Sequence, residues 1–82
     1  MQTAKRKIYL VTNLENDYYE KACAFPHQAY GHKDRRINEL VERIPIDIVM
    51  RGFNIECRFM DFEELDAILE GENTQEVWEE AR

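Results

Sequence analysis

The hydrophobic and polar positions follow two different periods along the chain. Residues 6–14 carry apolar side chains on both alternating faces, which is typical of an inner β-strand. Residues 16–25 predict a short helix that Pro26 ends. Residues 34–44 repeat apolar side chains at the i, i+3, i+4 and i+7 spacing, which predicts a half-buried helix that stops at Pro45.

Residues 44–59 have the pattern of a β-hairpin. The dipeptide Gly52-Phe53 suits a two-residue type II′ turn, and the register that follows gives one wholly apolar face, which includes Cys57. On the other face Asp47 lies opposite Arg58, an opposite-charge pair. We therefore expect two paired strands here.

Two helices are predicted to end the chain. Asp61 and Glu64 have the spacing of a capping box at the start of residues 61–71, and Asn73 caps a second, shorter helical segment over residues 74–82. The predicted order is β-α-α-β-β-α-α. It indicates an α+β fold, with a small three-stranded mixed sheet and helices packed on one face. Residues 1–82 are expected to form a single domain.

The composition indicates where in the cell the protein is expected. The longest apolar run, Ile8 to Val11, is far short of a membrane span, and no signal-peptide core follows the basic start. The two cysteines are then expected to be reduced thiols. These features favour a cytoplasmic protein with no membrane partner.

Charge is distributed unevenly and predicts where a partner binds. The chain has a net charge of −6, yet residues 53–82 hold ten acidic side chains against only Arg58 and Arg82. We call the cluster near the C-terminus the acidic lobe and expect it to bind a protein partner; its residues are Glu63, Glu64, Asp66, Glu70, Glu72, Glu76, Trp78, Glu79 and Glu80. In this interpretation the carboxylates attract a basic surface and Trp78 is a contact anchor. The alternative is an ordinary solvated surface with Trp78 packed in the core.

The sequence offers little support for a metal site. Cys23, His27 and His32 have spacings that match no standard structural zinc pattern, and Cys57 belongs to the apolar face of the predicted hairpin. We expect a helix end followed by a surface loop with two solvent-facing histidines. No metal and no cofactor are predicted.

Catalytic patterns are equally weak. The chain has no serine and no phosphate-binding glycine loop. Pro45, Asp47, Glu56 and Arg58 loosely resemble the carboxylate layout of metal-dependent nucleases, but Arg58 replaces the usual lysine and the expected register pairs it with Asp47. We predict that the protein is not an enzyme, and a small metal-dependent enzyme is the third alternative.

Size, acidity and the lack of catalytic apparatus together indicate a class of protein. In these respects the chain resembles the small accessory proteins of phages and mobile elements that inhibit host-defence or nucleic-acid enzymes by binding them, some by imitating the charge of DNA. The resemblance implies an inhibitor that binds a protein with a basic surface and does not bind nucleic acid directly. The alternative is a homodimeric assembly module joined through an open sheet edge or Trp78.

Overall fold

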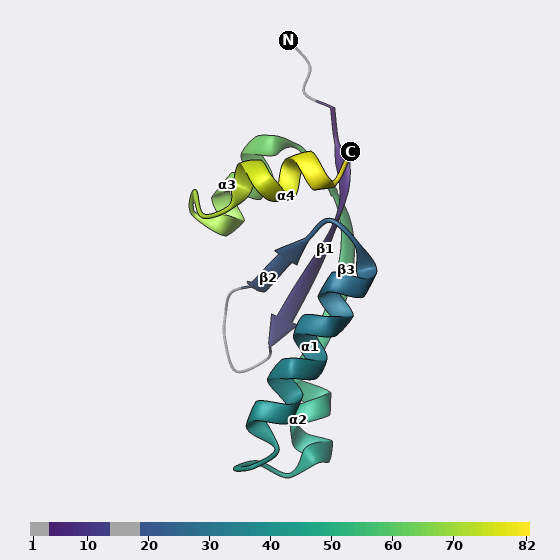
Figure 1. The fold of residues 1–82 in the computed structure, drawn as a ribbon, viewed down its shortest axis with the longest axis vertical. Coiled ribbons are helices and arrows are strands. Elements are labelled where there is room, and N and C mark those ends of the chain that lie inside the picture. Colours follow the sequence, from purple (N-terminus) through teal and green to yellow (C-terminus); the bar gives the residue numbers. More distant parts are fainter. Residues whose placement is uncertain (1–3, 14–18) are drawn as a thin grey trace.

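A computed structural model describes residues 4–13 and 19–82 and confirms the α+β class with a three-stranded sheet (Figure 1). The order of elements is β-β-α-α-β-α-α, which differs from the predicted order after the first strand. The elements are β1 (Arg6–Asn13), β2 (Tyr19–Cys23), α1 (Pro26–Leu40), α2 (Ile46–Gly52), β3 (Phe53–Met60), α3 (Phe62–Leu69) and α4 (Thr74–Glu80).

The sheet is antiparallel throughout, so the predicted mixed sheet is wrong. The strand order is β2-β1-β3, which confirms the first strand as the inner one. β1 pairs with β3 over eight residues, from Arg6 opposite Met60 to Asn13 opposite Phe53. A parallel neighbour needs a long crossover, whereas the chain reaches β2 directly after β1 and so pairs with it antiparallel.

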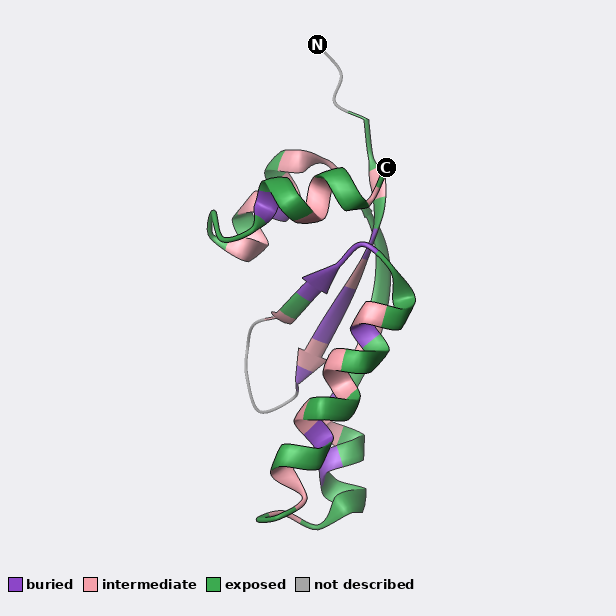
Figure 2. Cartoon of the chain, in the orientation of Figure 1, coloured by how far each residue is buried: buried purple, intermediate pink, exposed green. Residues whose placement is uncertain are grey.

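Helices cover both faces of the sheet, not one face as predicted. Alternation along β1 sends Val11 to one face and Ile8 and Leu10 to the other. The first core lies between the sheet, α1 and α2, with buried residues Val11, Cys23, Ala29, Ile37, Val49 and Phe53. The second lies between the sheet, α3 and α4, with buried residues Ile8, Leu10, Ala22, Met60 and Leu65. Figure 2 shows the buried positions concentrated in β1 and β2, while the helices expose much of their outer surface.

The predicted hairpin over residues 44–59 is wrong in its first half. Residues Ile46–Gly52 form helix α2, and β3 pairs with β1 instead of with them. As a helix, this segment places Val49 in the first core with Val11 and Phe53. Asp47 pairs with Arg51 one turn along α2, at 3.2 Å, and Arg58 donates to the Tyr19 hydroxyl at 2.9 Å. The predicted Asp47–Arg58 pair therefore does not form.

The predicted helix over residues 16–25 is also wrong where the structure describes it. Residues Tyr19–Cys23 are strand β2, and the predicted helix start at Asn16 lies outside the described residues. Pro26 begins α1 instead of ending a helix. This position suits proline, because the first helical residue needs no backbone N–H donor.

The capping box of α3 is confirmed. Asp61 Oδ1 accepts the Glu64 backbone N–H at 2.8 Å, and Glu64 Oε1 accepts the Asp61 backbone N–H at 3.2 Å. Helix α3 ends at Leu69, followed by Glu70 and Gly71 with positive φ of 53° and 83°. A tight turn of this kind holds α4 close to α3.

Replacing Asp61 by alanine is expected to lower the free energy of unfolding by about 1 kcal/mol, because it removes the acceptor for the first turn of α3. Urea denaturation measures the change. Asp34→Ala is the matched control, since Asp34 lies exposed inside α1 and caps nothing; its effect should stay within about 0.5 kcal/mol. Equal losses in the two variants would contradict the capping role.

Candidate interaction surface

The nine residues of the acidic lobe lie on α3, α4 and the turn between them, at one end of the sheet (Figure 1). Its members are brought together because α3 and α4 pack on each other and on the second core. The exposed members are Glu63, Glu70, Glu72, Glu76, Glu79 and Glu80, and the partly buried ones are Glu64, Asp66 and Trp78. The lobe is therefore one continuous structural unit whose carboxylates mostly face solvent.

Some of these carboxylates have partners within the chain. Glu64 lies 3.7 Å from Lys5 Nζ, its only ion-pair contact with a described residue. Asp66 accepts the buried Thr74 hydroxyl at 2.8 Å, which ties the start of α4 to α3. Glu79 and Glu80 accept neutral amide donors of Gln75 and Gln28, so they keep their charge unbalanced.

The remaining four carboxylates have no partner in the part of the chain that the structure describes. Within residues 4–13 and 19–82, no hydrogen bond or ion pair reaches the side chains of Glu63, Glu70, Glu72 or Glu76. Opposite charge from the chain itself thus neutralises little of the lobe. Its negative potential is available to another molecule.

Trp78 is held against the sheet. Its ring stands edge-on to Phe62, with centroids 5.7 Å apart, and the Arg6 guanidinium lies 4.0 Å from the ring centroid. Arg6 also donates to the Trp78 backbone carbonyl. The indole packs against the second core, as in the alternative in which Trp78 is a core residue. Its role as a partner anchor stays a prediction.

Two grooves line the outer edge of β2, and carboxylates of the lobe border both. One, of about 530 Å³, runs between β2 and the α3–α4 turn and includes Glu70 and Glu72. The other, of about 410 Å³, runs between β2, α1 and α4 and includes Glu76 and Glu80. Lys21 lines both grooves. The lobe therefore has concave edges and is more than a convex charged surface.

A polar cluster that the sequence did not indicate joins β2 to α1. Val11 lies opposite Lys21 and Thr12 opposite Tyr19, so Glu20 is the extra residue of a β-bulge. Its carboxylate reaches α1, where Oε1 lies 2.5 Å from Arg36 Nε and 2.9 Å from His32 Nε2. Oε2 accepts from Asn13 at 3.3 Å.

This cluster is electrostatically favourable. Burial alone raises the pKa of Glu20, but hydrogen bonds from Arg36, His32 and Asn13 outweigh it and leave the pKa below the ordinary value. Arg36 also pairs with Glu39 at 2.6 Å. The hydrogen bonds to Glu39 and Glu20 raise the pKa of Arg36. The arrangement balances the charge of Glu20 locally and fixes α1 on the sheet.

The cysteines and histidines are scattered. Cys23 is buried in the first core, where burial raises the pKa of its thiol, whereas Cys57 is exposed on β3 and so is not on a buried apolar face as predicted. His27 is exposed and stacks on Phe25, but His32 is engaged by Glu20, so the prediction of two solvent-facing histidines is half wrong. The described part of the chain contains no group of three or more potential metal ligands.

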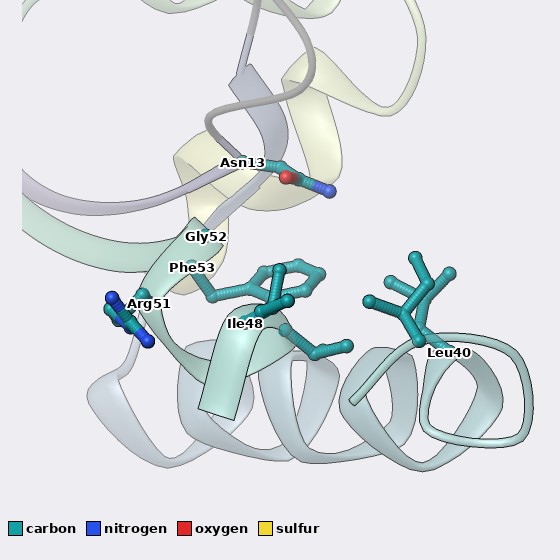
Figure 3. Close-up of a pocket in the computed structure, with 8 residues that line it drawn as sticks. Asn13, Leu40, Ile48, Arg51, Gly52 and Phe53 are labelled. Carbon is teal, nitrogen blue, oxygen red and sulfur yellow. The ribbon is translucent and has the colours of Figure 1, made fainter. Parts of the chain in front are cut away.

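An apolar pocket of about 280 Å³ (Figure 3) lies at the α1–α2 end of the molecule, away from the lobe (Figure 1). It is formed by α1, α2 and the adjoining ends of β1 and β3, and Leu40, Ile48 and Phe53 provide much of its wall. Arg51 stands at its side. Most of the described residues that line the pocket are apolar, so it can hold an apolar group.

The loose nuclease pattern does not assemble. Asp47 lies on α2 and Glu56 on β3, so the two carboxylates are not on adjacent strands as that layout requires.

No helix within residues 4–13 and 19–82 has the length and apolar character to cross a membrane. Comparison with protein-family models, curated proteins and solved structures finds no match.

Proposed function

We propose that this chain is a non-enzymatic binding protein whose acidic lobe docks on a basic, nucleic-acid-binding surface of a partner protein in the cytoplasm. It would act as an inhibitor or accessory protein of the kind that phages and mobile elements use against host-defence or nucleic-acid enzymes. The observation that supports this most is the set of four exposed carboxylates that have no hydrogen-bond or ion-pair partner among the described residues, Glu63, Glu70, Glu72 and Glu76.

The proposed binding depends on the negative charge of residues 61–82. Residues 61–82 hold nine acidic side chains and one basic side chain, Arg82, so their field repels phosphate and attracts lysine- and arginine-rich surfaces. A surface that binds nucleic acid presents lysine and arginine side chains to phosphate groups. The carboxylates of α3 and α4 can compete with phosphate for these side chains. Such binding is fast at low ionic strength and weakens as salt screens it.

Neutralising two lobe carboxylates should weaken binding to a cationic probe, whereas neutralising two elsewhere should not. The lobe variant is Glu72→Gln with Glu76→Gln, and the matched control is Asp34→Asn with Glu42→Gln on α1 and just after it. Both variants have a net charge of −4, because each loses two of the seventeen acidic groups. Affinity for an oligolysine peptide should fall about fivefold in the lobe variant and less than twofold in the control.

Equal losses in the two variants would show that net charge, not the lobe, governs the interaction. Affinity purification from a cell lysate at low and high salt addresses the natural partner. A charge-steered partner is captured at low salt and lost as the ionic strength rises. If nothing is captured at low salt and sedimentation gives only a salt-insensitive dimer, the inhibitor function is wrong.

A homodimeric assembly module is the second candidate function. The outer edge of β3 favours it, because none of the described strands pairs there.

A further inference from the structure

Strand β3 has an open edge with exposed apolar side chains. Its inner edge pairs with β1 over its full length, and within the described residues no strand lies on its outer edge. Phe59 is 64% exposed and Cys57 is also exposed. An edge of this length, with unpaired N–H and C=O groups, is a template for another strand.

The sequence of β3 is self-complementary about Cys57. Glu56 and Arg58 flank it with opposite charges, and Ile55 and Phe59 flank these with apolar side chains. When a second β3 runs antiparallel with the two Cys57 residues opposite each other, each Glu56 faces an Arg58 and each Ile55 faces a Phe59. Opposite charges meet on one face and apolar groups on the other.

Other registers lose this match. Centring the pair on Glu56 places two glutamates opposite each other, and centring it on Arg58 places two arginines opposite each other. A centre between Glu56 and Cys57 sets Ile55 against Arg58. Within β3 the charge is arranged for one symmetric alignment.

We propose that two copies of this chain associate through β3 in that register and form a continuous six-stranded antiparallel sheet around a two-fold axis. The alignment covers the exposed Phe59 of each copy with Ile55 of the other. Helix α2 ends at Gly52, directly before β3, and exposes Ile46, Ile48 and Met50 by 58, 53 and 53%. These side chains extend the apolar surface at the start of β3, where the C-terminal end of the second copy's β3 would lie.

Charge exchange within β3 provides the test. In Arg58→Glu each Glu56 faces a glutamate, so the dissociation constant measured by sedimentation equilibrium should rise about tenfold. Glu56→Arg should do the same. The double variant Glu56→Arg with Arg58→Glu restores both opposite-charge pairs and should recover the original dissociation constant to within about threefold. Because Glu56 and Arg58 also lie 3.9 Å apart within one chain, the free energy of unfolding of each variant is measured alongside, and recovery of the dissociation constant at unchanged stability identifies pairing between chains.

Cys57 reports on the register directly. Opposite residues of antiparallel strands have Cα atoms about 4.5 to 5.5 Å apart, within the range that a disulfide spans. Diamide should therefore join two Cys57 thiols into one disulfide, taking up both hydrogen atoms itself. Buried Cys23, whose thiol pKa is raised by its burial, should not react, and Cys57→Ser should abolish the cross-link.

Two results would overturn the dimer. One is a wild-type chain that sediments as a monomer at about 1 mM, where even weak association is populated. The other is a set of nuclear Overhauser contacts between Ile48 and Cys57 within one chain, which would show that residues 46–51 occupy the edge as a hairpin strand. The lobe variant Glu72→Gln with Glu76→Gln should dimerise normally, so failure of the dimer and failure of the proposed binding function are distinguishable.

Discussion

Replacing Leu65 by alanine is expected to lower the free energy of unfolding by about 2 to 5 kcal/mol. Leu65 of α3 is fully buried and belongs to the second core with Ile8, Leu10 and Met60 of the sheet. Truncation removes the buried side-chain carbons and leaves a cavity that the backbone cannot fully close. For a chain of this size the loss is a large part of the total stability.

The effect of Leu65→Ala should be concentrated in the lobe. Urea denaturation measures the global change, and amide hydrogen exchange should show α3 and α4 losing protection before β1 does. Ile46→Ala is the control, because Ile46 is 58% exposed on α2 and its loss should cost less than about 1 kcal/mol. Similar losses in both variants, or uniform loss of protection, would contradict the packing of the lobe through Leu65.

Replacing Glu20 by glutamine is expected to cost about 2 kcal/mol at pH 7. The side chain is only 11% exposed, and its carboxylate accepts from Arg36, His32 and Asn13. Glutamine keeps the shape but removes the charge, so the hydrogen bond from Arg36 loses its charge-assisted character.

The pH dependence of this loss has a definite sign. The folded-state pKa of Glu20 lies below its ordinary value, so the folded protein favours the ionised carboxylate. The resulting stability is fully present above the unfolded-state pKa, about 4.3, and is lost as the pH falls through the folded-state pKa. The difference between wild type and Glu20→Gln, measured by urea denaturation, should therefore shrink in acid.

Glu42→Gln is the control for Glu20, since Glu42 is exposed and has no hydrogen bond or ion pair with a described residue. Its effect should stay within about 0.5 kcal/mol at every pH. A Glu20→Gln penalty that is constant between pH 7 and pH 3 would contradict the role of the ionised carboxylate.

The elements that were predicted correctly have strong local signals. β1 has β-branched and aromatic residues on both faces, as an inner strand should, and α3 is defined by the Asp61 and Glu64 capping box. Both signals lie within a few residues of the element they specify. The acidic lobe was found for the same reason, because its members are close together in sequence.

The errors arose where distant pairing decided the outcome. Residues 46–52 alternate like a strand, but β3 pairs with β1, whose residues lie 40 to 54 positions earlier in the chain, and no local pattern reveals this pairing. Residues 19–23 are too few to distinguish a strand from a helix by periodicity. The prediction that helices cover only one face of the sheet was wrong for the same reason, because the sequence did not reveal how the strands pair.

The Glu20 cluster was missed because it depends on a bulge and on the true start of α1. His32 and Arg36 are four residues apart, a spacing that aligns both on one helix face once the helix begins at Pro26. That pair of cationic or hydrogen-bonding groups was the available signal. With residues 26–33 interpreted as a loop, the spacing had no structural meaning.

The most direct test of the proposed function is a map of the surface that a cationic ligand contacts. Titration of ¹⁵N-labelled protein with oligolysine should shift amide signals of residues 62–81 at low salt, and these shifts should disappear at high salt, with oligoglutamate as a control that causes none. Shifts spread over all elements, or confined to β3 and α1, would contradict the acidic lobe as the docking surface.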